Sequence, residues 1–413
     1  MPSARASGLR GIHSQPPDQA LVPCKRKSSR VEKIQLFQKN FQKSKMKGIF
    51  KMEQSLIVRG TPQEYLCEIG SWELLEGQLL CRNIHRVFIL HGTESWQAAK
   101  PYFPTFQKVT AVFENYGGVC TDQRVQELEA QVLDNHLEAI VAVGGGKVAD
   151  LGKALAHKMA LPVIILPTLA ATCAPCTPLS VMYREDGAME RYDVFPQANA
   201  LVLVEPRVLL HSPRSLMVAG IGDTLAKWYE ADAIISQLDV QVLPIQVSHF
   251  AAEKCRDILL NESINALKAM EEQQLNQSFI DVIETNLIIG GMVGGFGDDY
   301  GRTAGAHSIH DALTLLPASH RQLHGNKVAY GVFVQLAIEE KWQEIAELIP
   351  FYHQLGLPIS LKEMEMDLTE AEYQEVAERA CIEGETIHYM KQKITPEIVK
   401  TAMQDLEKYT ATK

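Results

Sequence analysis

Histidine is concentrated in one short stretch of this 413-residue chain, "GAHSIHDALTLLPASHRQLHGNKVAYG". Four of the 13 histidines, His307, His310, His320 and His324, lie within it, and the neutral imidazole ring is a common metal ligand. If the stretch begins as a helix, His307 and His310 share a face, and "LLPAS" ends that helix before "HGNKVAYG" begins another. We therefore expect the ends of two helices to bring His307 and His324 together.

A carboxylate could supply the third ligand that a metal held by two histidines needs. The sequence "AGIGDTLAKWYEA" offers Asp223, which we place just inside the start of a helix. An aspartate in that position can also act as an N-cap and nothing more. Both roles stay open on the residues alone.

Three consecutive glycines occur in "VAVGGGKVADLGKALA", between an apolar strand pattern and a helical one. Gly144, Gly145 and Gly146 would let the backbone approach a pyrophosphate, and the helix that follows would present free N–H groups to it. The motif matches neither the usual dinucleotide fingerprint nor the P-loop. It predicts a phosphate-binding turn, with a plain tight turn as the alternative.

Cys173 and Cys176 form a Cys-x-x-Cys pair in "ATCAPCTP", a spacing found in thiol redox and metal sites. A thioredoxin-like pair would place its first cysteine at a helix start, which lowers the pKa of the thiol. This pair instead follows "VIILPT", a run typical of a buried strand. We interpret the spacing as incidental, with a thiol redox protein as the alternative.

The elements that must position these residues alternate between strand and helix from residue 54 to about residue 210. The apolar runs rich in valine and isoleucine are residues 85–92, 108–115, 137–145, 161–168 and 200–206. This alternation predicts a mostly parallel sheet covered on both faces, which binds ligands beyond the carboxyl ends of its strands. Beyond about residue 212 only helical spacing remains, which predicts an all-helical second domain.

Charge separates the first 51 residues from the rest of the chain. They hold twelve Lys and Arg against two Asp and Glu, a balance of +10, whereas the whole chain carries −10, which leaves −20 on residues 52–413. We expect a basic, disordered extension over 1–51, an α/β dinucleotide-binding domain over 52–212 and a helical metal-binding domain over 213–413. The acidic body argues against nucleic-acid binding.

Composition also predicts the surroundings of the protein. We find no apolar run of about 18 residues, which is the length of a membrane span, and no signal-peptide pattern after Met1. The eight cysteines are scattered, which favours reduced thiols over a disulfide framework. We therefore expect a cytoplasmic protein that does not bind membranes.

Taken together, these motifs resemble those of the iron-containing alcohol dehydrogenases, in the glycerol dehydrogenase branch of that family. The sequences "GGGK", "PTLAATCAPCTPLSVMY", "GIGDTLAKWYEA", "HSIHDALT" and "HGNKVAYG" follow the family's order and spacing, and the resemblance covers about residues 54–405. It implies a Rossmann-like α/β domain and an all-α C-terminal domain, as in dehydroquinate synthase, with the active site between them. It also implies hydride transfer between NAD or NADP and a small molecule, in a homo-oligomer.

The resemblance implies roles for particular residues. Asp223, His307 and His324 would be the metal ligands, a donor set that suits zinc with an open position, with Fe²⁺ or another divalent metal as the alternative. His310 would act in catalysis by supporting these ligands or relaying a proton. The residues implied for cofactor binding are Gly144, Gly145, Gly146, Lys147, Thr168, Thr177, Leu179 and Tyr183.

Two positions depart from the glycerol dehydrogenases. Cys173 stands where those enzymes keep an aspartate for the glycerol hydroxyls, and Lys227 stands where related iron enzymes have a further histidine. Loss of a carboxylate and gain of an ammonium favour an anionic substrate such as a 2-oxo acid, so we expect Cys173 and Lys227 to act in catalysis. Two alternatives for Lys227 stay open: a solvated helix lysine, and a lysine that occupies the metal position and weakens metal binding. The same segments resemble the bacterial hydroxycarboxylate dehydrogenase A type more closely. A glycerol (polyol) dehydrogenase is the alternative, and a dehydroquinate synthase-type lyase is a more distant one.

A third departure concerns the choice of cofactor. His91, Gly92 and Thr93 follow the first long apolar run, where NAD-specific members of the family carry an acidic residue for the adenine ribose. Without that carboxylate the 2′-phosphate of NADP is not repelled. We therefore expect the protein to use NADPH as well as NADH.

Overall fold

The computed structural model describes residues 56–185 and 189–413. They belong to one compact unit, Gln54–Lys413. The basic extension expected over residues 1–51 lies outside the described residues. The further division of the unit near residue 212 stays a prediction, as do the homo-oligomer and the cytoplasmic location.

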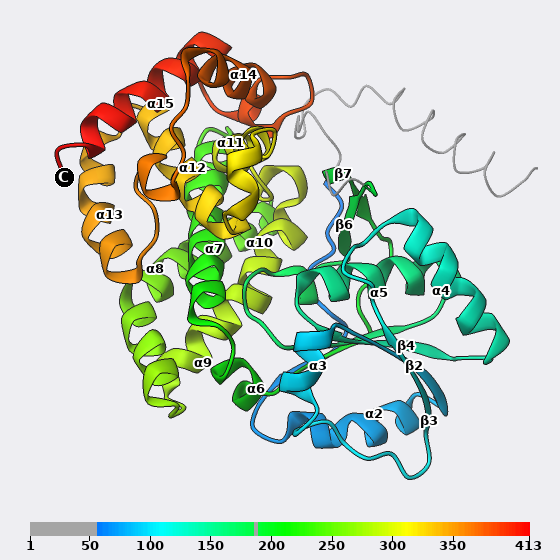
Figure 1. The fold of residues 1–413 in the computed structure, drawn as a ribbon. Coiled ribbons are helices and arrows are strands. Elements are labelled where there is room, and N and C mark those ends of the chain that lie inside the picture. Colours follow the sequence, from blue (N-terminus) through cyan, green and yellow to red (C-terminus); the bar gives the residue numbers. More distant parts are fainter. Residues whose placement is uncertain (1–55, 186–188) are drawn as a thin grey trace, which may run out of the picture. The chain divides into compact units, whose positions relative to one another are not determined.

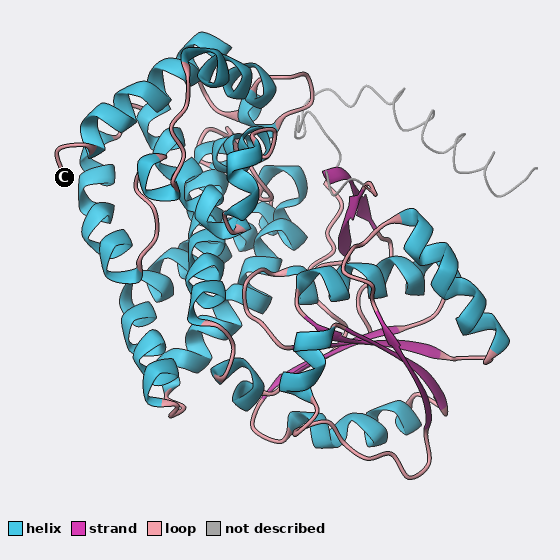
Figure 2. Cartoon of the chain, in the orientation of Figure 1, coloured by secondary structure: helices cyan, strands magenta, loops and turns pink. Residues whose placement is uncertain are grey.

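Six parallel strands form one sheet in the order β1-β8-β5-β4-β2-β3 (Figure 2). They are β1 (Tyr65–Cys67), β2 (Arg86–His91), β3 (Thr110–Asn115), β4 (Ala139–Gly144), β5 (Val163–Pro167) and β8 (Leu201–Val204). All five apolar runs are strands, so the predicted parallel sheet is confirmed. The sequence does not predict β1, because three residues at the edge of a sheet form no recognisable apolar run.

The central strands are buried on both faces, which explains their uninterrupted apolar character. Every residue of β4, β5 and β8 is buried. Helices α4 (Asp122–Asp134) and α5 (Gly146–Met159) cover one face of the sheet, and α2 (Leu75–Cys81) lies on the other (Figure 1). The sheet edge at the carboxyl ends of β4 and β5 is where the glycine turn and the cysteine-containing loop begin.

A small antiparallel hairpin follows that loop. It consists of β6 (Leu179–Tyr183) and β7 (Met189–Val194). The sequence does not predict this hairpin, because β7 has no fully buried residue and its pattern resembles an exposed loop.

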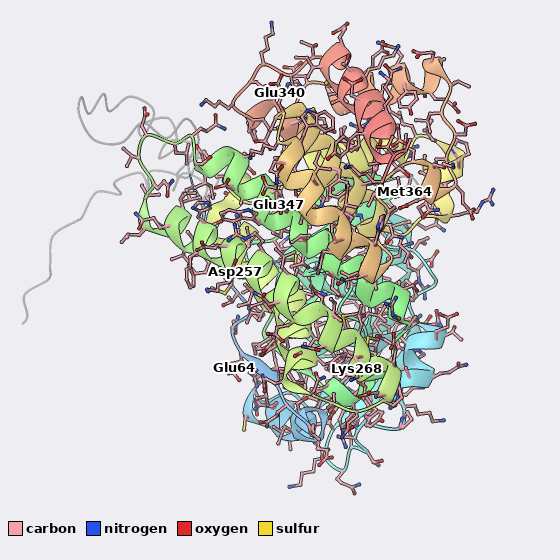
Figure 3. The ribbon with its side chains drawn as sticks, turned by 90° about the vertical axis from the view of Figure 1, so that its left-hand side faces the viewer. Glu64, Asp257, Lys268, Glu340, Glu347 and Met364 are labelled. Atoms are coloured by element: carbon pink, nitrogen blue, oxygen red, sulfur yellow. The ribbon has the colours of Figure 1, made fainter. Side chains whose placement is uncertain are left out.

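After Val204, every regular element among the described residues is a helix, so the predicted helical region is confirmed. They are α6 (Pro206–Leu210), α7 (Arg214–Ile235), α8 (Leu243–Glu272), α9 (Gln277–Glu284), α10 (Gly290–Gly297), α11 (Gly305–Leu313), α12 (His324–Ile338), α13 (Trp342–Leu355), α14 (Glu370–Ala380) and α15 (Pro396–Thr410), with short 3-10 turns between some of them. Figure 3 shows α8, which carries Asp257 and Lys268, beside α13, which carries Glu347.

One continuous helical segment, Gln277–Tyr300, is long and apolar enough to cross a membrane by length and composition. It joins α9 to α10 through a π-helical turn, η3 (Thr285–Ile289). Asp281, Glu284 and Asn286 interrupt the segment, so it is not an uninterrupted apolar run, although its apolar and small residues keep the mean hydropathy high. A single such helix is weak evidence for a span, since a core helix passes the same test, and 56% of its most apolar window is buried here.

Candidate active site

Three potential metal ligands from three helices converge in the helical region. Asp223 lies on α7, His307 on α11, and His324 is the first residue of α12. Oδ1 of Asp223 lies 3.3 Å from Nε2 of His307 and 3.3 Å from Nε2 of His324. One ligand atom from each side chain lies within 4.8 Å of the other two, and no other such group occurs among the described residues.

Asp223 lies well inside α7, which begins at Arg214. The expectation that Asp223 stands near a helix start is therefore wrong, and so is the N-cap alternative. The glycine before it suggests a helix start in the sequence but serves a packing function instead. A Cβ on Gly222 would lie 2.9 Å from the carbonyl oxygen of Gly325, so a larger residue would not fit.

Two backbone contacts hold the three helices close enough for the ligands to meet. A Cβ on Gly325 would lie 1.8 Å from the carbonyl oxygen of Ala219. The backbones of α12 and α7 are therefore in van der Waals contact where the two helices cross. A Cβ on Gly331 would lie 2.3 Å from the carbonyl oxygen of Ala306, which places α12 equally close to α11. Larger side chains here would separate the helices and with them the ligand atoms.

Glu230 orients His307, although no motif in the sequence singles this residue out. This carboxylate on α7 is fully buried, and its Oε2 lies 2.6 Å from Nδ1 of His307. Its Oε1 accepts hydrogen bonds from the backbone amides of Ala304 (2.7 Å) and His307 (2.9 Å). When Nδ1 donates to Glu230, Nε2 is left to face Asp223. Its spacing from Asp223 could have indicated this role, because a residue seven positions further along a helix lies two turns away on the same face.

His310 supports His324 in a similar way. Its Nε2 lies 2.9 Å from Nδ1 of His324, and its Nδ1 lies 2.9 Å from Oδ1 of Asp311. Burial lowers the pKa of His310 to about 3, so the ring is neutral near pH 7. A neutral ring that donates to Asp311 can accept from His324, which leaves Nε2 of His324 facing Asp223. The supporting role expected for His310 fits this geometry, and a proton relay through it stays a prediction.

The donor set fits a divalent metal ion. Oδ1 of Asp223 is buried and has no hydrogen-bond partner, although two imidazole nitrogens face it. Burial raises the pKa of this carboxyl, but His307 and His324 outweigh burial and hold it well below its usual value. A carboxylate oxygen and two oriented imidazole nitrogens are ligands that zinc accepts. His320 lies outside the group, because it is exposed and bonds to the carbonyl oxygen of Thr314.

The glycine turn has the predicted strand-turn-helix form. Gly144 ends β4, Gly145 is the N-cap and Gly146 begins α5. A Cβ on Gly144 would lie 2.6 Å from Cγ2 of Val148, and a Cβ on Gly145 would lie 2.8 Å from Cδ1 of Leu169. Gly144 therefore leaves no room for a larger residue, whereas one at Gly145 would require Leu169 to move. The turn presents the N-terminus of a 14-residue helix, where backbone N–H groups can bind an anion.

The other residues expected to bind a cofactor lie at the same sheet edge. Thr168 follows β5, and its buried Oγ1 has no hydrogen-bond partner. Leu179 and Tyr183 are the first and last residues of β6, and Thr177 precedes that strand. Lys147 is exposed, with its Nζ 5.4 Å from the centroid of the Tyr183 ring. The fold brings these residues into one neighbourhood, and their contact with a cofactor stays a prediction.

Residues 168–178, which we call the loop 168–178, approach the ligand group from the sheet side. A Cβ on Gly290 of α10 would lie 3.7 Å from Cβ of Cys173 and 3.3 Å from Cγ2 of Thr224, so all three residues are close together. Thr224 directly follows Asp223, so Cys173 lies close to the ligand group. The glycine-rich stretch around Gly290 is therefore part of a helix that packs closely against its neighbours, and it is not a nucleotide-binding loop.

Neither cysteine of the loop 168–178 has the properties of a redox thiol. Cys173 and Cys176 are both free. Burial raises the pKa of both thiols, whereas a reactive cysteine needs a lowered pKa. These observations favour the interpretation that the Cys-x-x-Cys spacing is incidental.

Lys227 places a positive charge beside the ligand group. It is buried on α7, and its Nζ donates to the carbonyl oxygen of Arg302 at 3.2 Å. Burial lowers the pKa of this ammonium, but the carboxylate of Asp223 outweighs burial and raises the pKa above its usual value. Lys227 is therefore charged at neutral pH.

Comparison with known proteins places this arrangement in a family. Residues 62–206 match the iron-containing alcohol dehydrogenases. Hydroxycarboxylate dehydrogenase A of Escherichia coli (strain K12) is 39% identical over 352 residues, which cover 85% of this chain and 97% of that protein. The chain belongs to the iron-containing alcohol dehydrogenase family. The resemblance inferred from the sequence motifs is thereby confirmed.

Glycerol dehydrogenases of this family are also similar to the chain. The enzyme from Thermotoga maritima is 33% identical over 355 residues, covering 84% of this chain and 96% of that protein. The crystal structure of a probable glycerol dehydrogenase from Sinorhizobium meliloti 1021 matches with a TM-score of 0.78 and 29% identity, over 87% of this chain and all of that one. Glycerol dehydrogenase from Schizosaccharomyces pombe matches with a TM-score of 0.77 and 26% identity, over 88% and 93% of the two chains.

The comparisons confirm the predicted fold, a parallel six-stranded sheet followed by a helical region, as the fold of glycerol dehydrogenases of this iron-containing alcohol dehydrogenase family. They also identify the protein as a dehydrogenase, which is an oxidoreductase. The relatives are named for different substrates, a hydroxycarboxylate and glycerol, so the family alone does not select one.

Proposed function

We propose that this dehydrogenase reduces a 2-oxo acid to the 2-hydroxy acid, with NADH or NADPH as the hydride donor. The carbonyl carbon accepts the hydride and the carbonyl oxygen accepts a proton. The convergence of Asp223, His307 and His324 next to the loop 168–178 carries the proposal, because it sets a cation-binding group beside the sheet edge with the glycine turn. The relative named hydroxycarboxylate dehydrogenase A, at 39% identity, supports the substrate class.

Asp223, His307 and His324 would hold a divalent metal, for which zinc fits the donors. When bound, such a metal polarises a substrate carbonyl as a Lewis acid. Glu230 and His310 keep the two imidazole rings in the tautomer that presents Nε2 to this position. The protein residues therefore fix the ligand geometry before substrate arrives.

The glycine turn and the buried hydroxyl of Thr168 would hold the dinucleotide. β2 ends at His91, and Gly92 and Thr93 follow as the N-cap and first residue of α3 (Thr93–Ala99). These three residues carry no carboxylate, so the 2′-phosphate of NADPH meets no repulsion from them. We infer that both cofactors are used.

Two side chains favour an anionic substrate. Cys173 lies against Gly290, near the ligand group, and contributes a small neutral surface. Lys227 contributes a buried positive charge beside Asp223. Cys173 therefore adds no negative charge, and Lys227 adds an ammonium that can attract the carboxylate of a 2-oxo acid.

A substrate panel tests the proposal. The purified protein is assayed by nicotinamide absorbance with 2-oxobutanoate, phenylpyruvate and glyceraldehyde, each with NADH and with NADPH, and with glycerol and the oxidised cofactors. We expect reduction of at least one 2-oxo acid with both reduced cofactors. If neither oxo acid is reduced, the proposed substrate class is wrong. If activity occurs with NADH alone, only the cofactor proposal is wrong.

Glycerol is the second candidate substrate, because the Thermotoga maritima relative at 33% identity and both structural neighbours are named for glycerol. Lys227→Met discriminates between the two. Loss of a charged hydrogen-bond donor predicts a drop of about 10- to 100-fold in kcat/KM for oxo acids, and a smaller drop for glyceraldehyde. Lys268→Met, at an exposed lysine of α8, is the matched control. Equal losses for both substrates contradict a carboxylate partner for Lys227.

A further inference from the structure

Lys153 is an almost completely buried lysine on α5, with 2% of its surface exposed. Its Nζ lies 2.9 Å from Oδ1 of Asp150. The same ammonium donates to the carbonyl oxygens of Ala174 (2.8 Å) and Thr177 (3.2 Å), and it also contacts that of Leu179. The Lys153 side chain therefore holds the loop 168–178 at two points, Ala174 and Thr177.

This loop lies between the glycine turn and the ligand group. On one side, a Cβ on Gly146 would lie 3.2 Å from Oγ1 of Thr172. On the other side, a Cβ on Gly220 of α7, the helix that carries Asp223, would lie 2.3 Å from the carbonyl oxygen of Ala170. The position of the loop therefore determines how far the proposed phosphate-binding turn stands from the helices that carry Asp223 and the histidines.

Asp150 also binds the segment that follows the loop 168–178. It lies on the same helix as Lys153, and its Oδ2 accepts a hydrogen bond from the backbone amide of Val181 at 3.3 Å. Its own carbonyl oxygen accepts one from Oγ of Ser180 at 2.8 Å. The pair is buried, so removing one member leaves an uncompensated charge, whereas removing both charges together leaves none.

We propose that Lys153 is a positioning residue that fixes the loop 168–178 against the glycine turn, so that cofactor and substrate are held in reacting geometry. It acts through the carbonyls of Ala174 and Thr177 in the loop and of Leu179 in β6, and it touches neither reactant. The inference rests on the proposed placement of cofactor and substrate beside this loop, and it holds for any substrate bound there.

Kinetics of Lys153→Met give the first test, with methionine keeping the apolar stem of the lysine. We expect kcat/KM to fall about 10- to 100-fold, because a misplaced loop spoils the orientation of the reactants, with binding of NAD(P)H measured by fluorescence changed much less. Lys158→Met is the matched control, at an exposed lysine of the same helix. The assay uses whichever substrate of the panel the wild type turns over. Wild-type kinetics for Lys153→Met overturn the proposal.

The double variant Lys153→Met with Asp150→Asn separates positioning from stability. It removes the unpaired carboxylate, so the thermal midpoint should recover most of what Lys153→Met alone loses. The loop carbonyls still lack their donor, so kcat/KM should stay low. If activity recovers together with the thermal midpoint, Lys153 is only one half of a structural ion pair and the proposal is wrong.

Thiol labelling reports on the loop without any turnover, which keeps the test independent of the proposed function. Cys176 in the loop and Cys255 on α8 are both buried. Native protein is treated with iodoacetamide, and the labelling rate of each cysteine is followed by peptide mass spectrometry. In Lys153→Met we expect Cys176 to react at least about tenfold faster through local opening, with Cys255 unchanged. Unchanged labelling of Cys176, or equal acceleration at both cysteines, overturns a local effect on the loop.

Discussion

The imidazole rings of His307 and His324 each use both nitrogens. One nitrogen is held, by Glu230 in the first case and by His310 in the second, and the other points at Asp223. A ring that makes only one contact can rotate, whereas these two are fixed by the helices that carry their partners. Asp223, His307, Glu230 and His310 are buried, whereas His324 is exposed and is oriented by its contact with the buried ring of His310.

The ligand residues can be tested one at a time. Asp223→Asn, His307→Ala and His324→Ala should each lose bound metal and most activity, because three protein donors leave no spare ligand. The measurement is metal content per chain by elemental analysis, alongside turnover. His320→Ala is the control, since this exposed histidine of the same segment bonds only to the carbonyl of Thr314 among the contacts described. Full metal content in the three ligand variants would contradict the assignment.

Glu230→Gln tests the support of His307. The amide still accepts a hydrogen bond but loses the charge, so we expect metal affinity to fall about 10- to 100-fold while the protein stays folded. Competition with a chromogenic chelator measures the affinity, and circular dichroism checks the fold. Glu253→Gln on the exposed side of α8 should change neither. An unchanged metal affinity in Glu230→Gln would show that the carboxylate serves only to cap α11.

At the scale of elements, the site depends on how closely α7, α11 and α12 pack. Gly325 and Gly331 of α12 allow backbone contact with Ala219 and Ala306. In this region the spacing between helices, rather than any loop, sets the distance between ligand atoms.

Gly325→Ala tests this dependence. A methyl group 1.8 Å from the carbonyl oxygen of Ala219 cannot be accommodated without moving a helix, so we expect a loss of about 3 kcal/mol or more in the free energy of unfolding. Gly77→Ala in α2 is the control, because a Cβ there meets nothing within 4 Å. It should be neutral or stabilise by up to about 1 kcal/mol. Urea unfolding measures both, and equal effects would refute the packing argument.

Local patterns in the sequence predict the elements that are buried or sharply interrupted. The central strands are apolar throughout because both faces are covered, and Pro317 marks the break between the two histidine-bearing helices. Long-range contacts are not visible in the same way. The buried roles of Glu230 and Lys153 depend on which segments fold against them, and the glycine before Asp223 indicates a helix start when its partner helix is unknown.

At the scale of the molecule, a metal at this site would join three helices that are distant in sequence. Metal binds the folded chain and not the unfolded one, so free Zn²⁺ at 100 times its Kd should add about 2.7 kcal/mol to the free energy of unfolding. Thermal unfolding of chelated and zinc-loaded protein measures the gain. The variant Asp223→Asn should show none, and a gain of equal size in that variant would place the metal elsewhere.

The edge strand β1 has a consequence for how the chain folds as it is synthesised. Tyr65–Cys67 pairs only with β8 in the sheet, and Trp72 just after it donates to the carbonyl oxygen of Leu203, 131 positions later. A nascent chain that has emerged from the ribosome only as far as β5 therefore holds its first strand without a neighbour. Pairings of such high contact order form late, and until then the open edge of β5 is available to other chains. Slow synthesis before residue 201 should for this reason favour chaperone binding and aggregation.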